Sequence, residues 1–528
     1  MRPFPEDPQI SGSVSSRRRH CIPLLLRPRL TWRYLLFSFA TIYILYCFIF
    51  SLPLFANPLP AYSGPYQVGT IDIEYPVSPT RVLDTARFKG SKEDAFELQT
   101  VLFTLYYPAQ PGKSHKSKHY WIPKPISVTA KGYAKFAHIS NFIIDAIFTG
   151  AIRVLVGGVT IPAEVDVPLS EAPSSILTAY TDASEEKGEE NIAVSETKGY
   201  PVVVFSHGMA SSRTDYTHYA GELASRGVVV AMIEHRDGSC PGSVIQQHGE
   251  PDQTRFTFRP SEVTSIEGKE LEIDYFKRAQ LSFREAEIEE TVSILRKINN
   301  GEGKEVFKLN SRNEGSGFVD WAGQLNTDEM IMAGHSYGAT GALQALKGGP
   351  THDRPFAGGI ILDPGKSSGR LNGDVRVPIM VIHSNSWSSK HSVFYGRPHF
   401  DVVRSIVQEN NDRGNPSWFV TSLGTSHPSV TDAPLLEPLL LSWTTGARID
   451  VYEGVKQYVH VSEDFLLFLQ KGEMRNLLAE KAEFPEYDAG KGFGVWKPGQ
   501  EQDEKNGGAW WDWRRYWQVH VSPKSNDS

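Results

Sequence analysis

The chain has 528 residues, of which 40% are hydrophobic and 22% are charged, and this balance fits an ordinary globular protein. The formal net charge of −7 argues against a nucleic acid as a partner. The three cysteines, Cys21, Cys47 and Cys240, lack metal-site spacing and supply no disulfide framework to the main body, so we expect no metal and no other cofactor.

The first 55 residues predict a membrane anchor. Residues 1–33 form a basic tail rich in proline, serine and arginine, and residues 34–55 carry no charged side chain. At about 1.5 Å per helical residue, this uncharged run is long enough to cross a bilayer. The positive-inside rule leaves the N-terminus in the cytoplasm and puts the main body in a lumen or outside the cell. A cleaved signal peptide and a buried core helix are the alternatives, and the long run behind its arginine cluster counts against both.

Residues 141–156 predict a strongly apolar helix. One interpretation is a helix that packs in the core, and the other is a helix whose apolar face touches a lipid surface. The side chains expected to make that lipid contact are Phe142, Ile143, Ile147, Phe148 and Leu155. The polar, acidic stretch over residues 170–198 predicts a solvated loop insertion.

Strand and helix patterns alternate through the main body. Residues 101–107 are rich in β-forming side chains, and residues 200–206 form a continuous apolar run, typical of a parallel strand buried on both faces. A further strand is expected over residues 227–233, and residues 280–300 predict a long amphipathic helix. This alternation indicates an α/β fold with a mostly parallel, doubly wound central sheet.

The pentapeptide Gly-His-Ser-Tyr-Gly over residues 334–338 predicts a catalytic serine. A short apolar segment over residues 330–333 precedes it as a buried strand, and small, helix-forming residues follow from Ala339. Strand, tight turn and helix are the context of a nucleophile elbow, in which glycines let the strand and the helix approach closely. We therefore predict Ser336 as the nucleophile, against the alternative of an ordinary Gly-Ser turn.

The acid that orients the base is expected after the nucleophile, because α/β-hydrolases place serine, acid and histidine in that order. The predicted strand over residues 356–362 ends at Asp363, whereas the strand over residues 377–382 ends at His383 with no carboxylate. This contrast favours Asp363, although many α/β-hydrolases take the acid from the later strand. The alternatives, which follow no clear strand, are Asp374 and Asp401.

His427 is the predicted base. It follows a strand expected over residues 417–423, and a histidine on a loop after the last strand can swing over the elbow. The other candidates are His383, His391 and His399. Backbone N–H donors for the oxyanion are predicted at Tyr337, directly after the nucleophile, and at Met209, in the loop after the strand over residues 200–206.

At these residues the chain resembles the platelet-activating-factor acetylhydrolases of the plasma and intracellular type, a branch of the α/β-hydrolase phospholipases. The similar stretches span roughly residues 64–470 and keep the same order. They are residues 64–69, 105–108, 200–208, 234–237, 334–338, 361–363 and 426–427. The family takes its acid from the earlier strand, so the resemblance also supports Asp363.

Membership would imply a calcium-independent serine esterase that cleaves short or oxidised acyl chains from the sn-2 position of phospholipids. It would also imply docking onto lipid through an apolar helix, for which residues 141–155 are the match. Departures from the family are Ala339 in place of a usual glycine, the acidic insertion, the anchor and a long C-terminal tail. The tail carries Trp496, Trp510, Trp511, Trp513 and Trp517, as an interfacial patch or as packing against the body.

The sequence thus predicts an α/β-hydrolase fold preceded by a transmembrane helix, acting as a membrane-anchored carboxylic ester hydrolase on phospholipid. A carboxylesterase or lipase on other esters and a catalytically silent binding protein are the alternatives. The expected parts are a basic tail (1–33), a signal anchor (34–55), a catalytic domain (64–470) with an insertion (170–198), and a Trp-rich extension (471–528).

Overall fold

The structure is a computed structural model of the 528-residue chain. It describes residues 31–49, 55–171, 199–438, 445–489 and 516–524. Nearly all of the acidic insertion predicted over residues 170–198 therefore lies outside the described residues, as do four of the five tryptophans of the C-terminal tail.

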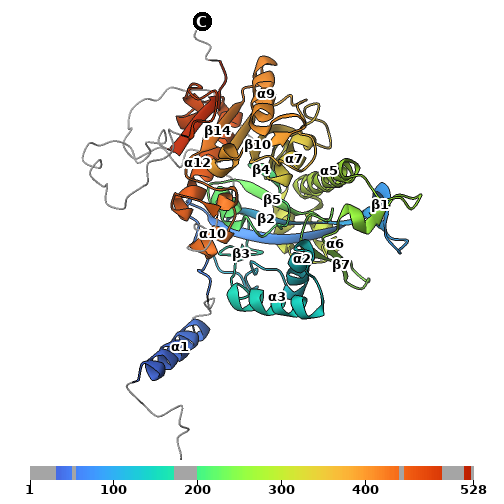
Figure 1. The fold of residues 1–528 in the computed structure, drawn as a ribbon, viewed down its shortest axis with the longest axis vertical. Coiled ribbons are helices and arrows are strands. Elements are labelled where there is room, and N and C mark those ends of the chain that lie inside the picture. The colour runs from blue at the N-terminus through green and yellow to red at the C-terminus, as the bar shows by residue number, and fades with distance from the viewer. Residues whose placement is uncertain (1–30, 50–54, 172–198, 439–444, 490–515, 525–528) are drawn as a thin grey trace, which may run out of the picture.

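An 11-stranded sheet runs through the body in the order β15-β14-β11-β10-β9-β4-β5-β2-β1-β3, with β8 paired to β1 (Figure 1). The six strands from β5 to β14 are parallel, and β1, β2 and β15 add antiparallel edges. This arrangement confirms the predicted α/β class with a mostly parallel sheet. The strands are β1 Gln67–Phe88, β2 Asp94–Ala109, β3 Glu164–Val165, β4 Tyr200–Ser206, β5 Val229–Glu234, β8 Val263–Thr264, β9 Leu325–His335, β10 Phe356–Leu362, β11 Ile379–Ser384, β14 Trp418–Ser422 and β15 Trp517–Val521.

Helices cover both faces of the sheet (Figure 1). Successive side chains of a strand point to opposite faces, so the apolar run of β4 divides between two cores. Val203 and Phe205 pack with α4 Thr217–Ala224 and α12 Val451–Lys471. Val202 and Val204 belong to the other core, with α5 Ile273–Lys297, α7 Tyr337–Ala345 and α9 His399–Asp412. A strand that is apolar along its whole length is thereby buried on both sides.

The remaining elements are short or peripheral. The helices are α1 Trp32–Ile49, α2 Ile126–Phe136, α3 Phe142–Leu155, α6 Gly303–Leu309, α8 Asn385–Ser389 and α10 Ala433–Leu436. Two small hairpins pair β6 Gly242–Ile245 with β7 Gln253–Phe256, and β12 Val393–Phe394 with β13 Arg397–Pro398. β15 comes from the tail predicted after residue 471, where Trp517 is buried at the sheet edge.

The N-terminal helix α1 extends away from the sheet (Figure 1), and its large apolar side chains, such as Phe39 at 77% exposure, lie open. It is shorter than the predicted span of residues 34–55, of which 50–54 fall outside the described residues. Within the described ranges, no helix combines the length and the apolar character that crossing a membrane requires, so the predicted anchor gains no support there.

Candidate active site

Ser336 occupies a sharp turn between β9 and α7, with φ 56° and ψ −118°. Two glycines make this turn possible. A Cβ atom at Gly334 would lie 2.3 Å from the carbonyl oxygen of Gly338, and one at Gly338 would lie 1.9 Å from that of Ser206 on β4. Strand, turn and helix therefore fit together only with glycine at both positions, as a nucleophile elbow requires.

The structure brings the predicted serine, histidine and aspartate together. His427 begins a short 3₁₀ helix after β14, and its Nε2 lies 3.0 Å from Oγ of Ser336. Its Nδ1 lies 2.8 Å from Oδ2 of Asp363, the residue directly after β10. When Nδ1 carries the proton, its N–H donates a hydrogen bond to the carboxylate. Nε2 is then free to accept the serine proton.

The carboxylate of Asp363 is anchored by the end of the neighbouring strand, β11. The backbone N–H of Ser384 donates to Oδ1 at 2.6 Å, and the Ser384 hydroxyl donates to Oδ2 at 2.7 Å. The hydroxyl of Ser386 accepts the backbone N–H of His427 at 2.9 Å. The end of β11, which has no carboxylate of its own, thus supplies hydrogen-bond donors to the carboxylate of Asp363 after β10. Sequence reasoning missed both serines, although they directly follow a predicted strand.

The alternative acids and bases lie in other environments. Asp374 pairs with Arg376 at 3.1 Å, and Asp401 pairs with Arg404 at 3.1 Å. His383 is fully buried, where its Nδ1 contacts the hydroxyl of Ser388, and His399 is buried in α9. His391 is exposed beyond α8.

The loop after β4 passes against the nucleophile, since a Cβ atom at Gly208 would lie 3.2 Å from Cβ of Ser336. The N–H of Gly208 is already used, because it donates to the Tyr216 hydroxyl at 3.1 Å. Across the described part of the chain, no protein acceptor takes the N–H of Met209 or of Tyr337. Both groups remain available to an oxyanion, and the role predicted for them from the sequence stays a prediction.

A buried network of charged side chains supports the loop after β4. Arg284 of α5 donates to the carbonyl of His207 at 2.8 Å and pairs with Asp237 at 2.8 Å, with both side chains fully buried. Burial and the charge of Arg284 lower the pKa of His207 to about 3, so its ring stays neutral. The Nε2 of this neutral ring accepts the N–H of His235 at 3.0 Å. Sequence reasoning did not find Arg284. The one clue in the sequence is that this arginine stands beside the apolar face of the predicted helix.

One group of described residues brings metal-ligating atoms within 4.8 Å of one another, and it consists of His335, Asp363 and His427. The rings of the two histidines pack with centroids 4.5 Å apart and planes at 36°. A metal lies in the plane of each imidazole that binds it, about 2.0–2.1 Å from the nitrogen. Both nitrogens of His427 already hydrogen-bond, to Asp363 and to Ser336, so this group does not fit a metal ion.

The predicted lipid-contact residues lie on α3, at the edge of the body beside α2 (Figure 1). The helix begins at its N-cap Asn141, whose side chain accepts two backbone N–H groups. None of its residues is buried, and Phe142 and Ile143 are 88% and 65% exposed. Ile147 and Leu155 are also exposed, whereas Phe148 is half-buried. The helix therefore presents an uncovered apolar face.

The fold and this site define an α/β-hydrolase: the serine stands on an elbow, and the acid and the histidine follow later parallel strands. Residues 55–176 and 173–484 match the model of the family described as platelet-activating factor acetylhydrolase, isoform II. The chain belongs to this family, which confirms the resemblance seen in the sequence.

Similar proteins include a putative phospholipase A2 of Schizosaccharomyces pombe, 28% identical over 53% of this chain and 57% of that protein. A platelet-activating factor acetylhydrolase of Cavia porcellus is 26% identical over 58% of this chain and 55% of that protein. The chain thus spans a little over half the length of these curated relatives. Among solved structures, a ferulic acid esterase from Streptomyces cinnamoneus has a TM-score of 0.45 and 15% identity, covering 81% of this chain and 96% of that one.

Proposed function

We propose that the protein is a serine esterase that hydrolyses the sn-2 ester of glycerophospholipids carrying a short or oxidised acyl chain. The observation that carries the proposal is the bonded chain from Ser336 through His427 to Asp363, with distances of 3.0 and 2.8 Å. The family and the names of the relatives, a phospholipase A2 and acetylhydrolases, support a phospholipid as the substrate.

In the first half of the reaction, Oγ of Ser336 attacks the ester carbonyl carbon while Nε2 of His427 takes the hydroxyl proton. The N–H groups of Met209 and Tyr337 hold the oxyanion that forms. When the ester bond breaks, His427 gives its proton to the departing glycerol oxygen, and the lysophospholipid leaves. Water then attacks the acyl-serine while His427 takes a proton from it, and His427 gives that proton to Oγ of Ser336 as the free acid leaves.

The partner of the exposed apolar face of α3 is, in this proposal, the surface of the phospholipid membrane. An apolar helix face lying in the headgroup region would bring the enzyme to substrate that is not free in water. Replacing Phe142 and Ile147 by serine should lower hydrolysis of phospholipid in vesicles and leave hydrolysis of a water-soluble ester unchanged. Ile266→Ser, at a side chain that is 67% exposed elsewhere, is the matched control. An equal loss on both substrates would remove the lipid-docking role.

The proposed location is a membrane, with the N-terminus in the cytoplasm and the catalytic domain in a lumen or outside the cell. Its support is the basic tail followed by the uncharged run of residues 34–55. Protease added to intact microsomes should leave the catalytic domain of the full chain undigested until detergent is added. Digestion without detergent would rule out this orientation.

Covalent labelling with a fluorophosphonate tests the chemistry. The wild-type protein should label, Ser336→Ala should not, and Ser91→Ala, in an exposed turn between β1 and β2, should label normally. Hydrolysis rates on short-chain and long-chain sn-2 phospholipids, beside a p-nitrophenyl ester, then test the substrate. Equal activity on every ester would favour a general carboxylesterase. If the wild-type protein does not label, the remaining hypothesis is a binding protein with a hydrolase fold.

A further inference from the structure

Trp387 of α8 stacks on the imidazole of His427. The centroids of the two rings are 4.0 Å apart, and their planes differ by 10°. His427 needs this ring orientation, because Nδ1 must face Asp363 while Nε2 faces Ser336. Its side chain is 30% exposed, so burial alone does not prevent the ring from turning toward solvent. A flat indole against the imidazole removes that freedom.

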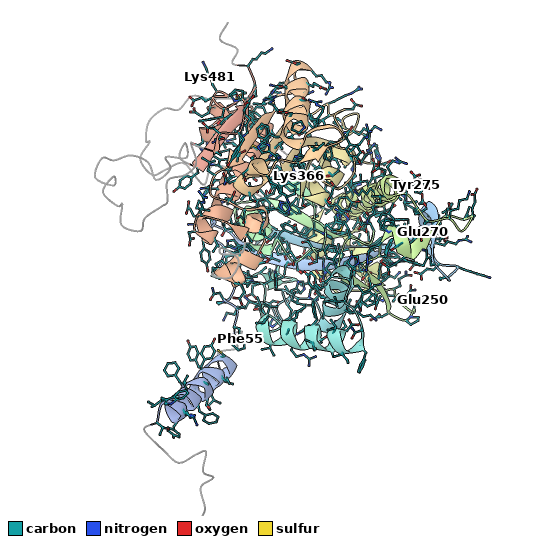
Figure 2. The ribbon with its side chains drawn as sticks, viewed as in Figure 1. Phe55, Glu250, Glu270, Tyr275, Lys366 and Lys481 are labelled. Carbon is teal, nitrogen blue, oxygen red and sulfur yellow. The ribbon has the colours of Figure 1, made fainter. Side chains whose placement is uncertain are left out.

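The indole is itself tied to the loop that carries the acid. Nε1 of Trp387 donates to the carbonyl of Pro364 at 3.0 Å. Figure 2 labels Lys366. Its Nζ donates to the carbonyls of Trp387 and Lys390, each at 2.7 Å, and lies 4.6 Å from the centroid of the indole. The residues that fasten Trp387 thus come directly after Asp363. The loop after Asp363 therefore positions both the acid and the indole, and both contact the imidazole of His427.

The stack also has an electrostatic consequence. During acyl transfer His427 becomes an imidazolium, and a cation over the face of a tryptophan is attracted by the negative π surface. The ring stack therefore favours the protonated base at the moment when the transition state requires it.

We propose that Trp387, fastened by the loop after Asp363, is a positioning residue that holds the imidazole of His427 in line and stabilises its protonated form. This inference rests on the proposed esterase function. A tryptophan that merely fills space would affect the stability of the fold and leave the pH dependence of the reaction unchanged.

The test compares Trp387→Leu with Trp387→Phe in the full chain, using a water-soluble p-nitrophenyl ester. Leucine keeps apolar bulk without a π face, so kcat should fall about tenfold while KM changes little. The acidic limb of the kcat/KM profile should move to lower pH by roughly half a unit. Phenylalanine should restore most of both quantities. The charged or titratable groups that face His427, which are Asp363, His335 and His383, stay the same in both variants, as does Lys366 beside the indole.

A second measurement preserves the shape of the side chain. Fluorinated tryptophans introduced at position 387 weaken the π face step by step, and the acidic limb should move stepwise in the same direction. An unchanged profile across this series, or equal losses in the leucine and phenylalanine variants, would overturn the inference. A wild type that hydrolyses no ester would instead refute the proposed function itself, so the two failures are distinguishable.

Discussion

Replacing Asp363 by asparagine should nearly abolish turnover while leaving the fold intact, and the structure specifies why. The backbone N–H of Ser384 donates to Oδ1 at 2.6 Å and cannot accept a hydrogen bond. In Asp363→Asn the amide oxygen must therefore take the Oδ1 position, and the NH₂ group takes the Oδ2 position, which faces Nδ1 of His427 at 2.8 Å. The base is then forced to carry its proton on Nε2.

An imidazole with its proton on Nε2 cannot accept the proton of Ser336. A wrong tautomer of this kind lowers kcat by about 10⁴ in a serine protease triad, and we expect a loss of the same order here. At 1.36 kcal/mol for each tenfold change, that loss is about 5 kcal/mol of transition-state stabilisation. The Ser384 N–H still donates to the Oδ1 position, and the Ser384 hydroxyl can turn to accept from the new NH₂ group, so the unfolding midpoint should change less than in Ser384→Ala.

The assay is steady-state hydrolysis of p-nitrophenyl acetate, with fluorophosphonate labelling as a second readout of the nucleophile. Asp374→Asn, at the half-exposed carboxylate that was an alternative acid, is the control and should behave as wild type. If Asp363→Asn retains kcat within tenfold of wild type, the assignment of the acid and the tautomer argument are both refuted.

Three further outcomes concern the scaffold. Gly338→Ala should lower the free energy of unfolding by about 1–3 kcal/mol in urea, because its Cβ would overlap the end of β4, whereas Gly341→Ala, whose nearest atoms lie at 3.6 Å, should lose nothing. Ser384→Ala removes a charge-assisted bond at 2.7 Å and should cost roughly 1.5–3 kcal/mol by the same measurement. Burial lowers the pKa of His520 to about 4. Below about pH 6.5 the unfolded chain therefore binds a proton at this histidine that the folded state does not bind, so the free energy of unfolding falls on acidification. Between pH 7 and pH 5 the wild type should lose up to about 2 kcal/mol more than His520→Gln, and equal losses would contradict this origin.

The strand ends around the nucleophile could be predicted because local sequence determines them. A parallel strand buried on both faces is a continuous apolar run, and the polar residue that ends the run stands at the catalytic edge of the sheet. The segment of residues 356–362 and the segment before Ser336 are of this kind, and β10 and β9 include them as expected. The order of serine, acid and histidine then limited the possible partners to a few.

The supporting residues could not be predicted, because they act through contacts between distant segments. Trp387 lies in a polar stretch without periodicity, and only the tertiary fold places it on His427, 40 positions later in the chain. β15 is similar: it pairs with β14 almost 100 residues earlier, although it lies in the extension predicted outside the catalytic domain. Non-local pairing of this kind leaves no trace in hydrophobic spacing. The membrane span expected over residues 34–55 rests on composition alone and stays a prediction, since residues 50–54 lie outside the described part of the chain.

The acid after β10 meets the histidine across the end of the neighbouring strand, β11. β11 lies between β10 and β14, so the histidine that follows β14 must reach across the end of β11 to meet Asp363 and Ser336. Both Asp363 and Ser336 have positive φ, 47° and 56°, conformations that cost non-glycine residues about 1–3 kcal/mol each. The two donors of Ser384 offset this cost at Asp363, and the small serine side chain leaves the path to the imidazole open. In this site the end of β11 supplies hydrogen-bond donors, and the carboxylate comes from the residue after β10.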